Sequence, residues 1–330
     1  MNDESREFVS RSLALLSDLA DITLLNFPRD HTKRSLDLTL KSRSYGTILL
    51  KLAYDVSSVG KSEREELKEM SSTLRINALI ISERKDNVKL LEGVVYDYDG
   101  SKVINMETLV SSLAGDFPFV YEDKNGFKVR IDGLELRKRR EQKGYSLGDL
   151  ASLVKVSRKS VYEYERGTMS PSIEVAERII NELGEDVVKS VNIFDPDDAI
   201  MSEGAQERSQ NIKFDDRNEE IVAQRLYELN YKTCHAKRAP LDLCFADGKT
   251  KAVLTIAHST DRPRILNDKV DNMSRLARSI DGESYVIVPN PNDRRLMLEN
   301  IINEPNDVFT IGEFLNYLGE RFAKGSCNNR

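Results

Sequence analysis

The sequence predicts a fold of two classes, with a central all-α bundle between two α/β domains. At 330 residues the chain is long enough for two or three domains that each bury a core. Apolar residues recur at helical spacing in four short segments between residues 134 and 183, whereas the flanking regions alternate strand-like apolar runs with helical patterns. The middle of the chain therefore predicts a helix bundle, and the flanks predict mixed sheets covered by helices.

The composition is that of a folded, soluble protein. Hydrophobic residues make up 39% of the chain and charged residues 32%, and no apolar run approaches the roughly 18 residues that a membrane-spanning helix needs. The N-terminus reads MNDESREF and lacks the basic start and apolar middle of a signal peptide. We therefore expect a cytoplasmic protein with no membrane partner.

The charge distribution restricts where nucleic acid can bind. A net charge of −6 argues against a surface that binds nucleic acid indiscriminately. Positive charge is concentrated between residues 134 and 170, where nine Lys or Arg residues stand against five Asp or Glu residues. Any contact with DNA is therefore expected in this segment.

The cysteines and histidines are too few and too scattered for the closely spaced ligand pairs of a zinc site. They are Cys234, Cys244, Cys327, His31, His235 and His258. We expect reduced thiols, and we interpret the adjacent Cys234 and His235 as a partly buried thiol beside a surface imidazole rather than as metal ligands. No phosphate loop, metal cluster or cofactor motif appears, so the sequence predicts neither a metal nor a cofactor.

Capping residues and glycines divide the central segment into four helices. The first covers residues 134–141 and stops at Gly144, and Ser146 caps the second, with Asp149 in the position of a capping-box acid. Ser157 caps the third, and the fourth follows Pro171. Leu134 and the stem of Lys138 share one face of the first helix, and the core-facing positions of the others are Leu147, Leu150, Ala151, Val154, Val161, Tyr164, Ile173, Ala176, Ile179, Ile180 and Leu183.

The central segment resembles the lambda-repressor/Cro type of helix-turn-helix (HTH). The matching positions are Ser146-x-x-Asp149-Leu150-Ala151, Val156-Ser157, Ser160-Val161, Glu165-x-Gly167 and Pro171. The resemblance implies that the second helix packs across the third and that the start of the third enters the major groove, where base edges are distinguishable. It also implies a buried ion pair between Arg140 and Glu165 and a structural role for Leu150, Ala151 and Val161.

Site residues follow from matching this sequence to the HTH pattern. Arg158 and Lys159 are the predicted base readers, because Arg bonds guanine with two donors and Lys supplies a point charge. One turn further along, Tyr162 and Glu163 are candidates for the same role. The predicted phosphate contacts are Ser157, Ser146, Lys155 and Arg166, the first because a helix N-terminus favours anions. The alternative for each charged residue is a solvated surface position.

Two positions depart from the HTH pattern. Lys155 stands in the turn where the family often has Gly, and a non-Gly residue adopts the left-handed conformation at some cost. Leu147 stands where the family often has a phosphate-binding Gln. These departures leave the fold unchanged but remove one familiar DNA contact.

The two flanking regions resemble each other and predict a divergent internal duplication. The matching stretches are 35–38 with 240–243, 48–54 with 252–258, Met70-Ser71 with Met273-Ser274, 78–81 with 285–288, and a final apolar helix pattern at Val103, Met106, Leu109, Val110 and Leu113 with Val308, Ile311, Phe314, Leu315 and Leu318. In each copy the predicted order is helix, strand, strand, helix, strand, helix, which indicates an α/β sandwich around a mixed sheet.

The order of elements in each copy resembles the Holliday-junction-resolvase and restriction-endonuclease type of fold. Active members need one acid and then an acid-x-Lys on the next strand, because these carboxylates hold magnesium. The first copy has Asp37 and Lys51 but Leu49 in place of the second acid. The second copy has Asp242, with Val253 and Thr255 at the other two positions. We therefore predict no catalytic residue, a strand-end hydrogen-bonding role for both aspartates, and either a phosphate contact or a solvent-reaching strand lysine at Lys51.

Two connectors complete the layout. Asn125-Gly126, between alternating residues from Phe119 to Ile131, predicts a tight hairpin, which either touches DNA through Lys124 and Lys128 or docks the bundle. The polar stretch 195–219 predicts a linker. The domains are thus expected at 1–116 and 220–330 (α/β), 117–132 (hairpin), 133–194 (HTH) and 195–219 (linker).

The whole layout resembles the archaeal HTH-type transcriptional regulators. That resemblance implies a sequence-specific DNA-binding regulator of double-stranded DNA. The small contact area of one motif predicts a homodimer, and no motif identifies a small-molecule effector. Two alternatives are a nuclease or junction-processing enzyme that the HTH targets to DNA, and an antitoxin-like or scaffold protein that regulates its own expression.

Overall fold

The computed structural model describes residues 3–195, 214, 216–247, 250–257, 261–288 and 307–327, with side chains in the last segment up to residue 321. The chain forms two units, one made of Met1–Leu79 with Ala205–Arg330 and the other of Ile80–Gly204. Helices and sheets occur together, so the predicted mixed α/β class is confirmed. Within the described ranges, no helix is long and apolar enough to cross a membrane.

The N-terminal part of the first unit is a helix-covered sheet. Its elements are α1 (Asp3–Leu19), β1 (Asp21–Leu24), η1 (His31–Lys33), β2 (Leu38–Ser42), β3 (Gly46–Asp55), η2 (Val56–Ser58), α2 (Lys61–Leu74) and β4 (Asn77–Lys85), which runs on into the second unit. Strands β1, β2 and β3 are antiparallel neighbours. Phe8 and Leu16 on one side of α1 are buried, as expected for an amphipathic helix on a sheet.

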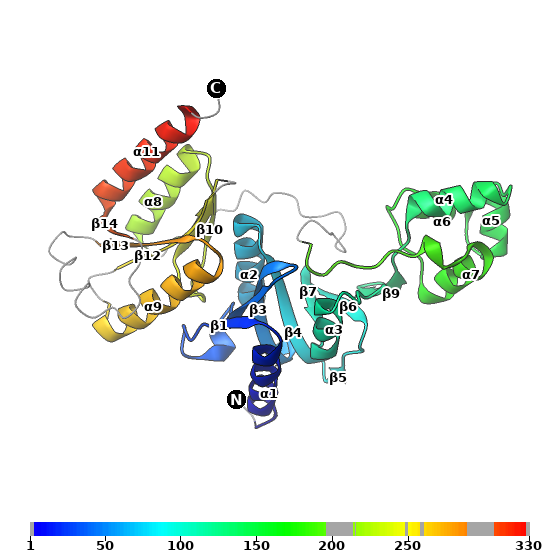
Figure 1. Ribbon diagram of the computed structural model, residues 1–330, viewed down its shortest axis with the longest axis horizontal. Coiled ribbons are helices and arrows are strands. Elements are labelled where there is room, and N and C mark those ends of the chain that lie inside the picture. The colour runs from blue at the N-terminus through cyan, green and yellow to red at the C-terminus, as the bar shows by residue number, and fades with distance from the viewer. Residues whose placement is uncertain are drawn as a thin grey trace. The chain divides into compact units, whose positions relative to one another are not determined.

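The C-terminal part of the first unit is a three-layer sandwich. It contains α8 (Arg217–Glu228), β10 (Lys232–His235), β11 (Leu243–Ala246), β12 (Lys251–Ile256), α9 (Pro263–Ser279), β13 (Glu283–Val288), β14 (Asp307–Thr310) and α11 (Ile311–Cys327). The strand order is β10-β11-β12-β13-β14, antiparallel up to β12 and parallel beyond it. Helices α8 and α11 cover one face of this sheet and α9 covers the other (Figure 1).

The buried strands of this sandwich follow the two-residue period of a sheet. Leu243, Phe245, Leu254 and Tyr285 belong to the core cluster that includes residues of α8 and α11. Residues between them, such as Val253, are equally buried on the other side. Since both faces are covered, these strands read as continuous apolar runs in the sequence.

The predicted order of elements omitted several strands. Strands β1 and β10 precede the first predicted strand of each copy, and Val103 and Val308, assigned to the final helices, lie in β7 (Ser101–Ile104) and β14. Four-residue edge strands carry too few residues for a clear alternation, and β1 is only partly buried. His258, residues 196–213 and residue 215 of the expected linker lie outside the described residues, as does the side chain of Cys327.

The expectation of reduced thiols is wrong for two of the cysteines. Cys234 on β10 faces Cys244 on β11 in the antiparallel register, with Cα atoms 5.1 Å apart, and the two form a disulfide. Their neighbour His235 is buried, with Nε2 lying 3.1 Å from Oε2 of Glu219 on α8. Because strand β10 was not predicted, the sequence did not show that these cysteines face each other.

The second unit contains the remaining strands of the sheet that begins with β1, and the helix bundle. After β4 come β5 (Val88–Lys89), β6 (Val94–Tyr98), β7, α3 (Met106–Leu113), β8 (Val120–Asp123) and β9 (Gly126–Val129), in the strand order β4-β7-β6-β8-β9 with β5 on β4. The hairpin predicted at Asn125-Gly126 is confirmed: β8 and β9 are antiparallel, and Gly126 has φ +94°. β8 also pairs in parallel with β6.

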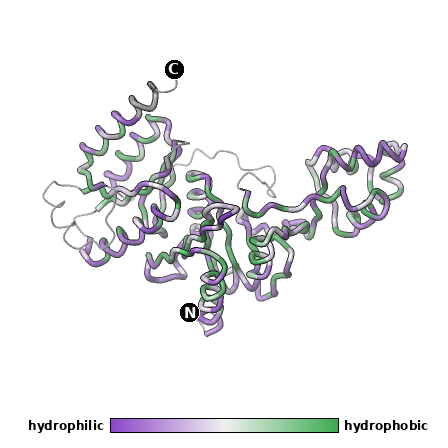
Figure 2. Tube along the Cα trace, in the orientation of Figure 1, coloured by the Kyte–Doolittle hydropathy of each residue, from purple (hydrophilic) through white to green (hydrophobic). Residues whose placement is uncertain are grey.

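The predicted bundle consists of α4 (Gly133–Gln142), α5 (Leu147–Leu153), α6 (Arg158–Glu165) and α7 (Ile173–Leu183), followed by η3 (Glu185–Val187). Helix α4 is strongly hydrophilic (Figure 2). Its buried apolar residue is Leu136, whereas Leu134 is 81% exposed. Ile173, expected in the core, is 46% exposed at the start of α7, because Ala176, Ile179 and Leu183 form the buried side of that helix.

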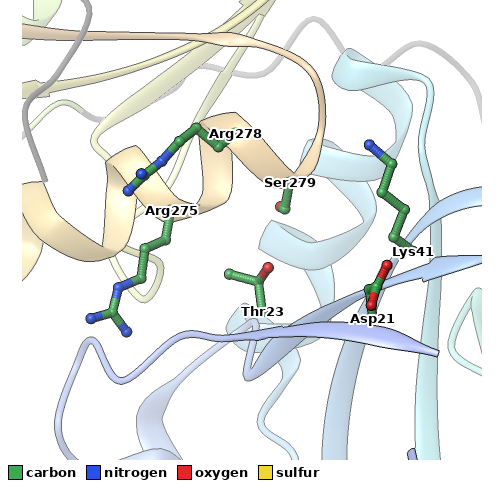
Figure 3. Close-up of a pocket in the computed structure, with 6 residues that line it drawn as sticks. All are labelled: Asp21, Thr23, Lys41, Arg275, Arg278 and Ser279. Atoms are coloured by element: carbon green, nitrogen blue, oxygen red, sulfur yellow. The ribbon is translucent and has the colours of Figure 1, made fainter. Parts of the chain in front are cut away.

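A pocket of about 360 Å³ opens within the first unit. It is lined by residues of β1, β2 and α9, and Figure 3 shows them. These residues are Asp21, Thr23, Lys41, Arg275, Arg278 and Ser279.

Candidate nucleic-acid interface

Two capped helices meet at a short turn. Ser146 and Asp149 form the expected capping box at the start of α5: Asp149 N donates to Ser146 Oγ (3.2 Å), and Ser146 N donates to Asp149 Oδ2 (2.8 Å). Lys155 has φ +57°, so it adopts the left-handed conformation that its position in the motif predicted. Ser157 Oγ then accepts from Ser160 N (3.0 Å) and caps α6.

Helix α6 has one buried and one exposed face. Val161 and Tyr164 point into the core that also holds Leu150 and Ala151. Arg158 and Lys159 lie in the first turn and are exposed. Among the residues that the structure describes, neither of these two cations has a hydrogen-bond or ion-pair partner, and the same is true of Lys155 in the preceding turn.

The cations of α4 behave differently, because carboxylates neutralise them. Arg137 bonds Glu141 (2.9 Å), and Lys138 and Arg139 both bond Glu135 (2.8 Å each). The hydrogen bonds from Lys138 and Arg139 lower the pKa of Glu135. Two further partners lie outside the basic segment: Arg139 also pairs with Asp186, and Lys143 pairs with Glu182. Of the basic residues counted in the sequence, those without an internal partner among the described residues therefore lie mainly at the start of α6.

The second turn of α6 is partly occupied by internal contacts. The guanidinium of Arg166 lies 5.6 Å from the centre of the Tyr162 ring, a cation–π geometry. Tyr162 is 46% exposed. The hydroxyl of Thr168 bonds both the carbonyl and the carboxylate of Glu163. Tyr162 thus remains available to a ligand, whereas part of the acceptor capacity of Glu163 is used.

A buried ion pair joins α4 to the end of α6. Arg140 Nε lies 2.5 Å from Glu165 Oε1, and Arg140 Nη2 lies 3.2 Å from Glu165 Oε2. Both side chains are about nine-tenths buried, and Arg140 Nη1 also donates to the carbonyl of Tyr145 (2.7 Å). With its donors satisfied in this way, Arg140 holds the helices in register, and hydrogen bonding to Glu165 raises its pKa.

The hairpin is docked onto the bundle. Val129 N donates to the carbonyl of Pro171 (3.0 Å), and Lys128 forms an isolated bridge with Ser172 at the cap of α7. Lys124 is exposed near the tip. The docking alternative for this hairpin therefore has direct backbone support.

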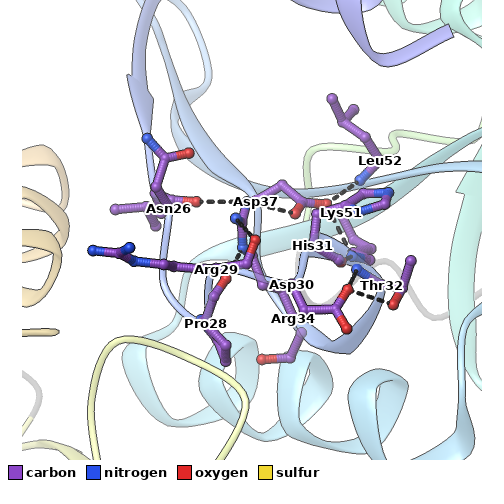
Figure 4. A network of polar contacts seen from close by, with 12 residues as sticks. Asn26, Pro28, Arg29, Asp30, His31, Thr32, Arg34, Asp37, Lys51 and Leu52 are labelled. Atoms are coloured by element: carbon purple, nitrogen blue, oxygen red, sulfur yellow. Dashed lines mark hydrogen bonds and ion pairs between the residues drawn. The ribbon is translucent and has the colours of Figure 1, made fainter. Parts of the chain in front are cut away.

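In the N-terminal α/β region, the residues at the nuclease-like positions, Asp37 and Lys51, form a buried polar cluster with their neighbours. Asp37 Oδ2 accepts from Leu52 N (2.9 Å) and from Lys51 Nζ (3.0 Å), and Arg34 Nη1 lies 3.6 Å from Asp37 Oδ1 (Figure 4). Lys51 is 3% exposed and also donates to the carbonyl of His31 (2.7 Å). Burial lowers the pKa of both His31 and Arg34. Lys51 therefore bonds only to groups inside the protein that are named above, and its side chain does not reach solvent.

The matching position of the second domain repeats this arrangement. Asp242 Oδ2 accepts from Ile256 N (2.8 Å), and Lys269 Nζ on α9 lies 2.5 Å from Asp242 Oδ1. Thr255 is fully buried, as are Leu49 and Val253, the residues that replace carboxylates. No cluster of three His, Cys, Asp or Glu residues suited to a metal ion occurs among the described residues.

Sequence reasoning missed several residues that shape the interface. Asp132 caps α4 by accepting from Leu134 N and Glu135 N (3.0 Å each). An Asp directly before the basic helix was a usable signal for this cap. Glu182 and Asp186 lie 39 and 47 residues from their partners, and local spacing alone does not reveal such pairs.

Two domain families match the chain. Residues 6–118 match the PD-(D/E)XK superfamily domain, and residues 136–189 match the helix-turn-helix domain. The HTH resemblance is thereby confirmed, and so is the nuclease-like resemblance of the N-terminal α/β region. No solved structure matches the chain.

Similar proteins occur in several archaea and share one name, "Putative HTH-type transcriptional regulatory protein". The protein of Aeropyrum pernix is 31% identical over 320 residues, which cover 95% of this chain and 94% of the relative. The protein of Methanocaldococcus jannaschii is 33% identical over 73% of this chain and 74% of its own, and that of Pyrococcus furiosus is 29% identical over 82% and 86%. The likeness thus spans both α/β regions and the bundle, and the chain belongs to this family of HTH-type transcriptional regulatory proteins.

Proposed function

We propose that this protein is a sequence-specific, DNA-binding transcriptional regulator that inserts the start of α6 into the major groove. The observation that carries the proposal is the separation of charge in the bundle. The cations of α4 are bonded to carboxylates, whereas Lys155, Arg158 and Lys159 gather without internal partners at the turn and first turn of α6. Exposed, unpaired cations at a helix N-terminus suit the phosphates and base edges of DNA.

The residues divide into two roles. Arg158 and Lys159 are the base readers, with Tyr162 beside them, and Glu163 is a weaker candidate because Thr168 bonds its carboxylate. The phosphate contacts are Ser146, Ser157, Lys155 and Arg166. Loss of a base reader relaxes discrimination at one base pair, whereas loss of a phosphate contact weakens all sequences alike.

The protein acts on DNA as a homodimer. A single bundle contacts too few base pairs for strong specificity, and two bundles read half-sites roughly 34 Å apart along the duplex. This proposal rests on the size of the bundle and on the presence of one HTH match per chain.

The test compares two double variants that remove the same charge. Genome-wide mapping of bound DNA first supplies a target, whose affinity is then measured by fluorescence anisotropy at fixed salt. We expect Arg158→Ala with Lys159→Ala to lose about 1–3 kcal/mol of binding free energy for each lost base contact.

The matched control is Arg137→Ala with Lys138→Ala on α4, where both cations are already bonded to carboxylates. We expect its dissociation constant to change by less than about fivefold, because exposed ion pairs contribute little. Equal losses in the two variants would show that only overall charge matters, and unchanged binding in the first variant would remove Arg158 and Lys159 from the reading role.

The two α/β regions are proposed to be copies of one ancestral domain that no longer catalyses. In each, an aspartate directly before a strand accepts from the amide of a residue on the following strand, Leu52 in one and Ile256 in the other, and a lysine neutralises it. Magnesium-dependent cleavage requires carboxylates that Leu49 and Val253 do not supply, and Thr255 stands where the second copy would need the lysine.

A nuclease is the second candidate function, and the match of residues 6–118 to the PD-(D/E)XK superfamily favours it. Incubation of the purified protein with duplex and branched DNA in magnesium tests this candidate. We expect no cleavage. Cleavage that Asp37→Ala abolishes would replace the regulatory proposal for the flanking domains with an enzymatic one.

A further inference from the structure

The two α/β parts of the first unit pack against each other reciprocally. Helix α2 contacts β10 and β11, and helix α9 contacts β1 and β2. The loops repeat this exchange: Arg238 Nη1 lies 3.1 Å from Glu66 Oε1 on α2, and Asn26 N donates to Asn272 Oδ1 on α9 (2.6 Å). Each helix therefore covers the strand pair of the other part.

The two halves of this interface carry different residues at corresponding positions. Under the proposed duplication, the matches of Leu38 with Leu243 and of Met70 with Met273 align Lys41 with Ala246 and Arg275 with Ser72. In the α2 half, Lys232 Nζ donates directly to Ser72 Oγ (2.8 Å), so strand and helix are in contact. In the α9 half, the pocket of about 360 Å³ lies between strand and helix instead. Packing a helix on these strands therefore does not by itself require the cations of the pocket.

The polar groups of the pocket change in kind from one end of it to the other. Figure 3 shows the hydroxyls of Thr23 and Ser279 between the two arginines of α9 and the side chains of Lys41 and Asp21 on the strands. Three of the six lining residues are cationic and one is acidic. The arginine end therefore suits an anionic group, and the end with Asp21 suits a group that both donates and accepts hydrogen bonds.

The cations of the pocket already have internal partners. Arg278 Nε donates to the carbonyl of Ser274 (3.3 Å), within one turn of α9. Lys41 Nζ lies 2.9 Å from Asp281 Oδ1, but the two side chains are 49% and 74% exposed. Arg275 Nη2 lies 2.9 Å from Asp271 Oδ2, a contact within one turn of α9. The exposed pair of Lys41 and Asp281 contributes little to stability, so a ligand can replace it. The Asp271 side chain is only 16% exposed, but a guanidinium has five donors, so Arg275 can bond a ligand while it keeps this partner.

We propose that this pocket binds a small phosphomonoester with hydroxyl groups, of the size of a sugar phosphate or a mononucleotide. Arginine binds phosphate through two parallel hydrogen bonds, and the pocket volume falls in the lower part of the roughly 300–1,000 Å³ range of small-molecule sites. Thr23, Ser279 and Asp21 supply partners for the ligand hydroxyls. The site belongs to the α/β part of the chain and does not depend on the proposed DNA-binding role of α6.

The test is isothermal titration of the full-length protein with ribose 5-phosphate at constant ionic strength. We expect saturable binding that ribose does not reproduce, and an affinity that falls at least about tenfold in the double variant Arg275→Gln with Arg278→Gln. The matched control is Arg262→Gln with Arg264→Gln, which removes two exposed arginines from the other end of α9 and leaves the affinity unchanged. Thermal unfolding within the wild-type range establishes that each variant is folded.

Three results would overturn the proposal. The first is the absence of saturable binding to the wild-type protein, and the second is equal affinity in the pocket variant. The third is a loss of DNA affinity in the pocket variant without any binding of ribose 5-phosphate, which would assign the arginines to the DNA backbone. Failure of the DNA-binding proposal is detected separately, by the Arg158 and Lys159 variants.

Discussion

The start of α4 is held so closely against the end of α6 that only glycine fits there. A Cβ atom on Gly133 would lie 2.3 Å from the carbonyl oxygen of Glu165 and 2.7 Å from its carbonyl carbon. The same two helices share the buried pair of Arg140 and Glu165. This region therefore fixes the position of α6, the proposed reading helix, relative to the rest of the bundle.

Replacement of Gly133 by alanine is expected to destabilise the bundle by about 1–3 kcal/mol, because the added methyl group meets backbone that cannot move alone. Chemical denaturation followed by circular dichroism measures the change. Gly148→Ala is the control, since a Cβ there meets only Ser146 Oγ at 3.6 Å, and alanine favours a helix by up to about 1 kcal/mol. Equal stability of the two variants would contradict the close contact.

Single residues were predictable from sequence where local rules decide their conformation. Lys155 stands in the turn where the HTH family often has Gly, so a left-handed conformation was expected there, and its φ of +57° agrees. Gly133 lay just outside the predicted helix, and its importance comes from a contact with residue 165 that no local pattern encodes. Leu134 and Leu136 show the same limit, since their burial is set by the direction from which α6 packs.

At the scale of elements, the helices were easier to predict than the strands. Capping residues at Ser146 and Ser157 and apolar spacing defined α5 and α6 almost to the residue. Strands β1 and β10 have only four residues each and lie at the edges of their sheets. An edge strand exposes part of its side chains and carries little alternation, so the sequence gives it a weak signal. The disulfide depends on β10 and was missed for the same reason.

The disulfide between Cys234 and Cys244 is expected to stabilise the C-terminal α/β part. Closing a loop of ten residues in the unfolded chain contributes about 2–3 kcal/mol in the loop-entropy account. Guanidinium unfolding with and without a reductant measures the difference. The variant Cys234→Ala with Cys244→Ala serves as the control, because its unfolding does not respond to the reductant.

Thiol titration of the unreduced, denatured protein provides a second measurement of the same bond. The chain has three cysteines, so we expect one reactive thiol before reduction and three after it. Three thiols before reduction, together with unfolding that ignores the reductant, would contradict the disulfide.

For the whole molecule, the reciprocal packing of α2 and α9 changes how the flanking domains are viewed. The sequence predicted two related α/β domains and did not predict a contact between them. In the structure, the faces made by α2 with β10 and β11 and by α9 with β1 and β2 are covered within one chain. This pairing joins segments more than 150 residues apart, and it was not predictable because sequence similarity between the two regions does not show that they pack together.

Each 37.5 kDa chain carries one match to the HTH domain, so two chains are needed to read two half-sites. We expect the complex with the mapped target to contain two chains, as measured by mass photometry, and a footprint of two protected regions about 10 base pairs apart. Inserting about 5 base pairs between the half-sites turns one of them to the opposite side of the duplex and should abolish joint binding, whereas inserting a full turn of about 10 keeps both on one side.

A complex of one chain that binds an isolated half-site as tightly as the full site would contradict the dimer. The charge-matched variants on α4 and α6 would then still test base reading, because that role depends on the cations of α6 and not on the number of chains.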